Sequence, residues 1–336
     1  MAQHIIGAKG SRPAPPDDAP QVRQLVVAED GEGQRLDNYL VKVLKGAPKT
    51  LVYRIIRSGE VRVNKARAAA DTRLAIGDVL RVPPLRLAAP DEAAKAAVPA
   101  REFTVLLEDE HLIAIDKPAG VAVHGGSGLS FGVIEQLRRA RPTARFLELV
   151  HRIDKETSGI LLIAKKRSAL TALQEQFRSR ETGKTYAALV PGAWPARLKL
   201  IDVALHKYLD AAGERRVRTV DDGDAEEGKR SISLVQVVRR YRDFSLLDVT
   251  IKTGRTHQIR VHLAHAGHAI VGDPKYGDFA LNKSLARGAL LPGLRFERMF
   301  LHARRLRFEH PATGAVVELK AALPPECETL LAALSP

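Results

Sequence analysis

The chain has 336 residues, enough for a large hydrophobic core and a second, smaller module. Its single cysteine, Cys327, excludes an internal disulfide framework and a zinc site built from several cysteines, and no apolar run approaches the roughly 18–20 residues of a membrane helix. Lys and Arg outnumber Asp and Glu by 53 to 39, and the resulting charge of +14 favours a polyanionic partner, most often nucleic acid.

Residues 1–33 contain Pro, Ala and Gly with little hydrophobic periodicity, so we expect an N-terminal extension whose start is disordered. The first 20 residues lack the charged start and apolar centre of a signal peptide. We therefore expect a cytoplasmic protein with no membrane partner.

A compact α/β segment is expected at 34–85. Apolar residues recur at helical spacing within 36–43 and 51–56, and the short runs 61–65 and 79–82 are typical of strands that adjoin turns. Two short helices and a small sheet are therefore predicted.

The positive charge is concentrated in the same part of the chain. Between Gln34 and Arg86 there are twelve Lys and Arg residues against four Asp and Glu, so +8 of the total charge lies there. Such clustering favours RNA or DNA as the partner. Residues 86–100 are rich in Ala and Pro and predict a linker to a domain at 101–336.

From Phe103 onward the pattern mixes strands and helices. A helix after 164 has Ser168 as its expected N-cap, and a second helix has Thr256 as its expected N-cap and ends at Gly267. The acidic segment 221–227 is expected to be a solvated hairpin tip. Strands are predicted at Thr104–Leu107, Leu112–Ile115, Leu147–Val150, Ile160–Ala164, Thr185–Val190, Ile232–Val238 and Ser245–Ile251.

Three polar segments are candidates for chemistry. The densest, HRIDKETSG at 151–159, lies between two predicted strands that would hold it rigidly, although a tight turn explains its composition better when the segment is taken alone. The segment 253–260 predicts a turn and a helix start suited to binding a phosphate, or else an ordinary capped helix with a basic face. Tyr186, in the third segment, could simply be a half-buried core residue.

Two other patterns do not indicate a ligand site. His257, His262, His265 and His268 lie close together, but they lack the HExxH spacing and a nearby carboxylate, so surface or phosphate-contacting histidines explain them better than a metal site. The glycines at 125–128 lack the GK[ST] that follows a phosphate-binding loop and predict a flexible turn. We expect no metal and no nucleotide cofactor.

Taken together, four motifs resemble the RluA-type family of pseudouridine synthases. They are LIAIDKPAGVAVHGG at 112–126, HRIDKETSG at 151–159, KTYAALV at 184–190 and TGRTHQIRVH at 253–262. Their order agrees with the family, and the resemblance covers most of 103–320. Ile153 replaces the commoner Leu, Glu156 stands where Asp is frequent, and the acidic segment 221–227 is longer than usual.

The resemblance implies an α+β catalytic domain with a mixed, mostly antiparallel sheet, which isomerises uridine in large-subunit ribosomal RNA without a cofactor. Asp154 matches the catalytic aspartate, Tyr186 the active-site tyrosine, and Arg260 the arginine that pairs with the aspartate. Arg152 is the candidate for filling the space of a flipped base, with a phosphate contact as the alternative. His151, Arg255 and His257 are further candidates for contacting RNA.

Residues 34–82, including RLDNYL and SGEVRVN, resemble an S4 domain, a small basic RNA-binding module. The resemblance implies RNA contacts on this module. The candidates are Arg35, Arg54, Arg57, Arg62 and Lys65.

Other functions fit parts of the sequence. A noncatalytic RNA-binding or ribosome-assembly protein would use the basic module while the larger domain only docks. A metal-dependent nuclease or phosphatase would need paired carboxylates at metal-binding spacing, and that pattern is missing from the sequence. Within the synthases, another ribosomal position or a transfer RNA is the alternative substrate. A monomer is expected.

Overall fold

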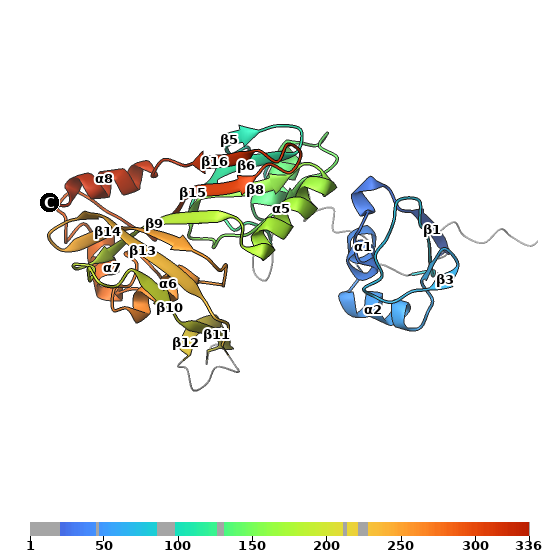
Figure 1. Ribbon diagram of the computed structural model, residues 1–336, viewed down its shortest axis with the longest axis horizontal. Coiled ribbons are helices and arrows are strands. Elements are labelled where there is room, and N and C mark those ends of the chain that lie inside the picture. Colours follow the sequence, from blue (N-terminus) through green and yellow to red (C-terminus); the bar gives the residue numbers. More distant parts are fainter. Residues whose placement is uncertain are drawn as a thin grey trace, which may run out of the picture. The chain divides into compact units, whose positions relative to one another are not determined.

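A computed structural model describes residues 21–44, 47–85, 98–125, 131–210, 214–220 and 228–335 (Figure 1). The chain divides into two compact units, 1–93 and 94–336. Most of the expected linker 86–100, the glycines 126–128 and the acidic segment 221–227 lie outside the described residues. The expectations about them stay predictions.

The N-terminal unit packs two helices on a small sheet. Helices α1 (Leu36–Val43) and α2 (Lys49–Arg57) are both confirmed as predicted. The sheet has the order β1-β4-β2-β3, formed by Arg23–Val26, Val79–Val82, Arg62–Val63 and Ala66–Arg67. Strand β1 was not predicted. It belongs to the expected extension 1–33, and its pairing with β4 is a long-range contact that local periodicity does not reveal.

A larger sheet organises the second unit (Figure 1). Its order is β10-β13-β14-β9-β15-β8-β6-β5, with β16 paired to β15 and β7 to β8. The β8–β15 pair is parallel and the other pairs are antiparallel, so the predicted α+β class with a mixed, mostly antiparallel sheet is confirmed. The strands are β5 Thr104–Glu108, β6 Leu112–Lys117, β7 Glu148–Leu149, β8 Ser158–Ala164, β9 Gly183–Pro191, β10 Leu200–Asp202, β13 Ile232–Arg240, β14 Phe244–Ile251, β15 Leu301–Glu309 and β16 Val316–Lys320.

Helices and one separate hairpin complete the unit. Strands β11 (Ala204–Leu209) and β12 (Arg215–Val220) pair with each other and extend away from the large sheet (Figure 1). The helices are α4 Val133–Ala140, α5 Arg167–Ser179, α6 Gln258–His265, α7 Phe279–Ala286 and α8 Pro325–Ala333.

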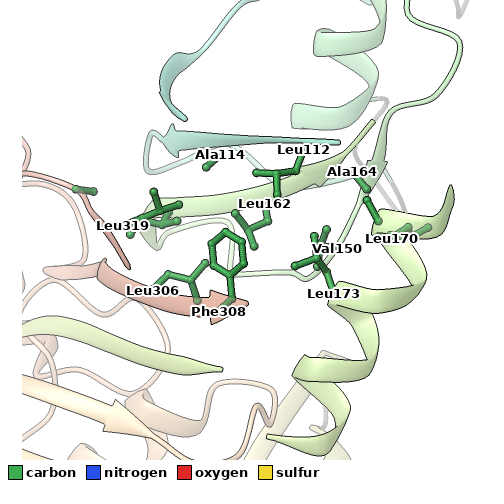
Figure 2. Packing of buried hydrophobic residues seen from close by; sticks show 13 residues of the cluster. Leu112, Ala114, Val150, Leu162, Ala164, Leu170, Leu173, Leu306, Phe308 and Leu319 are labelled. Atoms are coloured by element: carbon green, nitrogen blue, oxygen red, sulfur yellow. The ribbon is translucent and has the colours of Figure 1, made fainter. Parts of the chain in front are cut away.

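Helix α5 covers one face of the sheet around β8 and β15. Leu170 and Leu173 of the helix pack with Leu162, Leu306 and Phe308 of these strands, all at most 5% exposed (Figure 2). Because both faces of β8 are buried, its sequence SGILLIA is a continuous run of buried residues without alternation. This packing fixes the strand that follows the segment 151–157.

Both predicted helix N-caps were wrong. Helix α5 begins at Arg167 with Lys166 as its N-cap, because the chain turns into the helix directly after β8. Helix α6 begins at Gln258, and its N-cap is His257 in the left-handed conformation. The N-cap makes no side-chain hydrogen bond to the helix, and the amide oxygen of Gln258 instead accepts from the Arg255 backbone N–H at 3.1 Å, which fixes the turn before the helix.

The parallel contact between β8 and β15 depends on Gly159. Its φ is +108°, and a Cβ built there would lie 2.4 Å from the carbonyl oxygen of Ala303. Only glycine permits this backbone conformation and this approach together. The strand that follows HRIDKETSG therefore reaches β15 through the last residue of that motif.

We predict that Gly159→Ala lowers the free energy of unfolding by about 3 kcal/mol, because it adds a backbone clash to an unfavourable φ. The matched control is Gly314→Ala, whose φ of +69° is also positive but whose Cβ meets nothing within 4 Å. The control should lose only about 1 kcal/mol. Urea unfolding of both variants measures the difference, and equal losses would contradict the close-approach argument.

Candidate active site

The segment between β7 and β8 forms part of a cavity wall. Ile153 is 7% exposed and packs in the core behind this wall, and Asp154 beside it lines the same cavity. Lys117 is fully buried and links this segment to the chain after β6. Its amine donates to the carbonyl of Lys155 in the segment at 3.1 Å and to those of Pro118 and Val121 at 2.8 Å each. Burial lowers the pKa of Lys117 to about 7. The backbone beside Asp154 is thus fixed by interior hydrogen bonds.

Arg260 of α6 joins two carboxylates. Its Nη1 donates to Oδ2 of Asp154 at 3.1 Å, while Nε and Nη2 donate to Oδ2 and Oδ1 of Asp273 at 2.7 and 2.8 Å. The Arg260 side chain is 4% exposed and that of Asp154 is 24% exposed. No described residue donates a hydrogen bond to the other oxygen, Oδ1, of Asp154. One oxygen is therefore held by a guanidinium while the second is available to a substrate.

Asp273 is a residue of the site that the sequence analysis did not identify. Its side chain is fully buried, and Oδ1 also accepts from the backbone N–H groups of Lys275 and Tyr276 at 2.8 and 3.1 Å. Burial alone would raise the pKa of Asp273, but the hydrogen bonds and charge of Arg260 hold it below its usual value. The sequence GDPKYG signals a turn, yet nothing local indicates that its carboxylate orients Arg260.

His257 connects Asp154 to the hairpin β11–β12. Its Nε2 lies 3.8 Å from Oδ2 of Asp154, and its Nδ1 lies 2.8 Å from the Tyr276 hydroxyl, which accepts from the Val217 N–H at 3.1 Å. This chain of bonds suits the tautomer in which Nε2 carries the proton toward Asp154. Burial lowers the pKa of His257, although the charge of Asp154 opposes that shift.

Tyr186 of β9 lies in the same cavity. Burial, with a smaller contribution from the charge of Asp154, raises the pKa of its hydroxyl, so the phenol stays protonated at neutral pH. Among the residues that the structure describes, its hydroxyl has no hydrogen-bond partner. Tyr186 therefore offers a ring face and a proton donor, but not a phenolate base.

The cavity has a volume of about 140 Å³ and is lined by Asp154, Tyr186, Lys184, Arg255, Arg260 and Phe177, among others. For comparison, an engineered cavity of about 150 Å³ accommodates one benzene ring. The space therefore suits a single planar six-membered ring. Its polar groups converge from β9, α6 and the segments that precede β8 and α6.

The other residues predicted to contact RNA near the cavity differ in their surroundings. The His151 ring stacks on Phe177 with centroids 4.6 Å apart, and its Nε2 accepts from the Leu162 N–H at 3.1 Å. His151 therefore anchors the segment, and its proposed RNA contact stays a prediction. Arg152 is exposed at the cavity rim. Arg255 is half-buried, and its Nε is buried without a hydrogen-bond partner in the described part of the chain.

His262 corrects an expectation. It is fully buried, with Nδ1 at 3.0 Å from the Ser233 hydroxyl and Nε2 at 3.2 Å from the Val203 carbonyl, so it is neither a surface nor a phosphate-contacting residue. Burial lowers its pKa to about 4. Within the described ranges, no group of three or more His, Cys, Asp or Glu side chains has the geometry of a metal site.

A basic groove adjoins the cavity. Arg152 and His257 line both spaces, and the hairpin contributes Lys207, Tyr208 and Arg216 to the groove. Its volume is about 1000 Å³, several times that of the cavity. The cavity for one ring thus opens beside a groove with several cations.

On the N-terminal unit, the candidate RNA contacts are largely solvent-accessible. Arg54, Arg57 and Lys65 are exposed and Arg62 is half-buried, whereas Arg35 is held by Asp37 at 2.8 Å. In neither unit does a described helix have the length and apolar character needed to cross a bilayer.

The N-terminal unit has a basic helix, α2, and the second unit has a carboxylate–guanidinium pair in a ring-sized cavity beside a basic groove, features that fit an enzyme that modifies RNA. Residues 111–265 match the family described as RNA pseudouridylate synthase, and residues 34–80 match the S4 domain. The chain belongs to the RNA pseudouridylate synthase family, as predicted from its motifs.

The chain is also similar to individual proteins of this family. The chain is 49% identical over 317 residues to ribosomal large subunit pseudouridine synthase C of Pasteurella multocida, covering 93% of this chain and 94% of the relative. The protein of that name from Escherichia coli (strain K12) is 47% identical, with coverages of 90% and 94%. Among solved structures, human RNA pseudouridylate synthase domain containing 4 has a TM-score of 0.57 at 26% identity, covering 69% of this chain and 94% of that one.

We predict that Asp273→Asn slows pseudouridine formation by about 10- to 100-fold, because it weakens the orientation of Arg260 toward Asp154. Asp278→Asn is the matched control, since Asp278 caps α7 and asparagine caps a helix equally well. Single-turnover rates and RNA affinity should be measured for both variants. A normal rate for Asp273→Asn would show that Arg260 needs no such support.

Proposed function

We propose that this chain isomerises specific uridines of large-subunit ribosomal RNA to pseudouridine, with Asp154 as the catalytic carboxylate. The observation that carries the proposal is the pairing of Asp154 with Arg260 at 3.1 Å, at the wall of a cavity sized for one pyrimidine ring. The substrate class is supported by the names of the relatives, which are 47–49% identical.

The reaction requires one bond to break and another to form. The bond from ribose C1′ to uracil N1 is cleaved, the base reorients, C1′ bonds to C5, and the proton on C5 moves to N1. No electrons are gained or lost overall, so the chemistry needs no redox partner. The protein must provide an extruded base, a carboxylate near C1′ and stabilisation of charge.

In this proposal Asp154 acts on the sugar through its free oxygen. Arg260 holds the other oxygen and stabilises the negative charge of the carboxylate. The carboxylate could add to C1′, or it could assist an elimination in which the ribose loses a proton. Both routes require the carboxylate beside the sugar, so both depend on Asp154.

Tyr186 packs against the uracil ring in the cavity and supplies a protonated hydroxyl. Arg152, exposed at the rim, fills the space left by the extruded base. Arg255 and His257 contact the RNA beside the cavity, while His151 supports the segment that carries Asp154. The cationic groove next to the hairpin β11–β12 binds the flanking strand.

The N-terminal unit, proposed as an RNA-binding domain at 34–85, adds sequence-independent affinity through its cations. The catalytic domain is proposed at 101–336. The monomeric state and the cytoplasmic location expected from the sequence stay predictions.

We predict that Asp154→Asn abolishes pseudouridine formation, with a loss of at least ~10⁴-fold, because an amide has no negative charge to offer C1′. Purified wild-type and variant proteins are incubated with unmodified large-subunit ribosomal RNA, and pseudouridines are mapped by position. Product at defined uridines from the wild type alone is the expected result.

The control is Asp202→Asn, which makes the same chemical change in an exposed ion pair with Arg230 and should leave the rate unchanged. The experiment also tests the competing functions. If Asp154→Asn retained full activity, the catalytic assignment would be wrong, and a wild type that binds RNA without forming pseudouridine would favour a ribosome-assembly role. Chelator-sensitive cleavage of the RNA would instead favour a nuclease.

Replacing Arg54, Arg57 and Arg62 together by Gln should raise KM for ribosomal RNA with little change in kcat. Loss of three phosphate contacts should reduce the slope of log affinity against log salt by about 3. Arg307→Gln, an exposed arginine on β15, is the comparison variant and should leave the slope unchanged. The slope is measured by titrating RNA binding from low to high salt, and an unaltered slope in the triple variant would contradict the proposed contacts.

A further inference from the structure

Lys184 of β9 is a cation for which the mechanism above has no role. It is only 8% exposed, and its side chain lines the cavity that contains Asp154 and Tyr186. Residues two apart on a strand point to the same face, so Lys184 and Tyr186 project from β9 together. The Nζ atom lies over the Phe177 ring, 5.3 Å from its centroid.

No described carboxylate forms an ion pair with Lys184, and no described residue accepts a hydrogen bond from its Nζ. The neighbouring charge that influences it is Arg180, another cation, and burial together with Arg180 lowers the pKa of Lys184. A largely desolvated amine without an anion is unfavourable in the free protein, and such groups cluster at sites where a ligand supplies the missing partner.

Lys117, which is also buried, differs from Lys184 in its hydrogen-bond partners. Lys117 is fully buried, but three backbone carbonyls accept its three N–H bonds. Lys184 has only a ring face, and that ring also lines the cavity. Its donors are therefore available to whatever enters the cavity.

The reaction develops negative charge on the base within this cavity. When the C1′–N1 bond breaks, its electron pair stays with the ring, and the detached base is a uracil anion whose charge spreads over N1, C5 and the two carbonyl oxygens. Asp154 cannot stabilise that anion, and Arg260 is occupied by two carboxylates. Among the cavity-lining side chains, an unpaired ammonium suits this task.

We propose that Lys184 is a further catalytic residue, which binds a carbonyl oxygen of the extruded uracil and stabilises the uracil anion between detachment and reattachment. The inference rests on the proposed function. A backbone phosphate is the less suitable partner, because the cavity of about 140 Å³ is sized for the base, whereas the exposed Arg152 and the groove serve the strand outside it.

The test replaces Lys184 by Met, which keeps the length and apolar stem of the side chain but removes the charge. Single-turnover rates are measured with enzyme in excess on a ribosomal RNA fragment containing the target uridine, because they report chemistry without product release. We expect Lys184→Met to be about 100-fold slower, with RNA affinity nearly unchanged. Lys184→Arg, which keeps the positive charge, should restore most of the rate.

A second substrate separates catalysis from folding. In RNA with 5-fluorouridine at the target position, the fluorine withdraws electron density and stabilises the detached base by itself. The defect of Lys184→Met should therefore shrink to about tenfold or less when consumption of the fluorinated nucleoside is followed by mass spectrometry of digested RNA. Because both substrates are compared within one variant, a partly unfolded preparation does not alter the ratio.

Lys166→Met, the same change at a 44%-exposed side chain, is the control and should match the wild type on both substrates. Equal defects of Lys184→Met on the two substrates, or a loss of RNA affinity as large as the loss of rate, would overturn the inference. So would a normal rate in Lys184→Met while the wild type forms pseudouridine. A wild type that forms none would instead refute the proposed function.

Discussion

The site depends on one buried guanidinium shared between two carboxylates. Arg260 is almost inaccessible to solvent, and it is stable there because Asp273 and Asp154 both accept its hydrogen bonds. A buried charge is costly unless it is paired and fully hydrogen-bonded, and Asp273, with its additional backbone donors, meets that condition. The pair with Asp273 fixes the guanidinium, and the guanidinium in turn fixes Asp154.

The sheet explains why these groups meet. Asp154 precedes β8, Tyr186 lies on β9, and Arg260 follows β14, which pairs with β9. Strand β15 lies between β8 and β9 and joins them through one parallel and one antiparallel contact. Three segments distant in sequence therefore reach one cavity on a rigid framework, and rigid placement is what a reaction at a single carbon atom requires.

The distribution of charge around the cavity follows the needs of the proposed reaction. Among the residues that line the cavity, Asp154 has the only carboxylate, whereas Lys184, Arg152 and Arg255 line it without described carboxylate partners. The free protein thus carries uncompensated cations, a small loss of stability that an anionic substrate reverses. The same cations that favour substrate binding therefore lower the stability of the free protein, as is common at active sites.

The sequence by itself determined the family, the α+β class and most strands, because these depend on local periodicity and on contiguous motifs. It also named Asp154, Tyr186 and Arg260 as candidates, and the structure places all three in one cavity. It did not determine β1, the N-caps of α5 and α6, the burial of His262 or the role of Asp273. The pairing of β1, the burial of His262 and the role of Asp273 depend on partners distant along the chain, such as β4 for β1 and Arg260 for Asp273. Local composition carries no record of such pairings, and only the tertiary structure decided them.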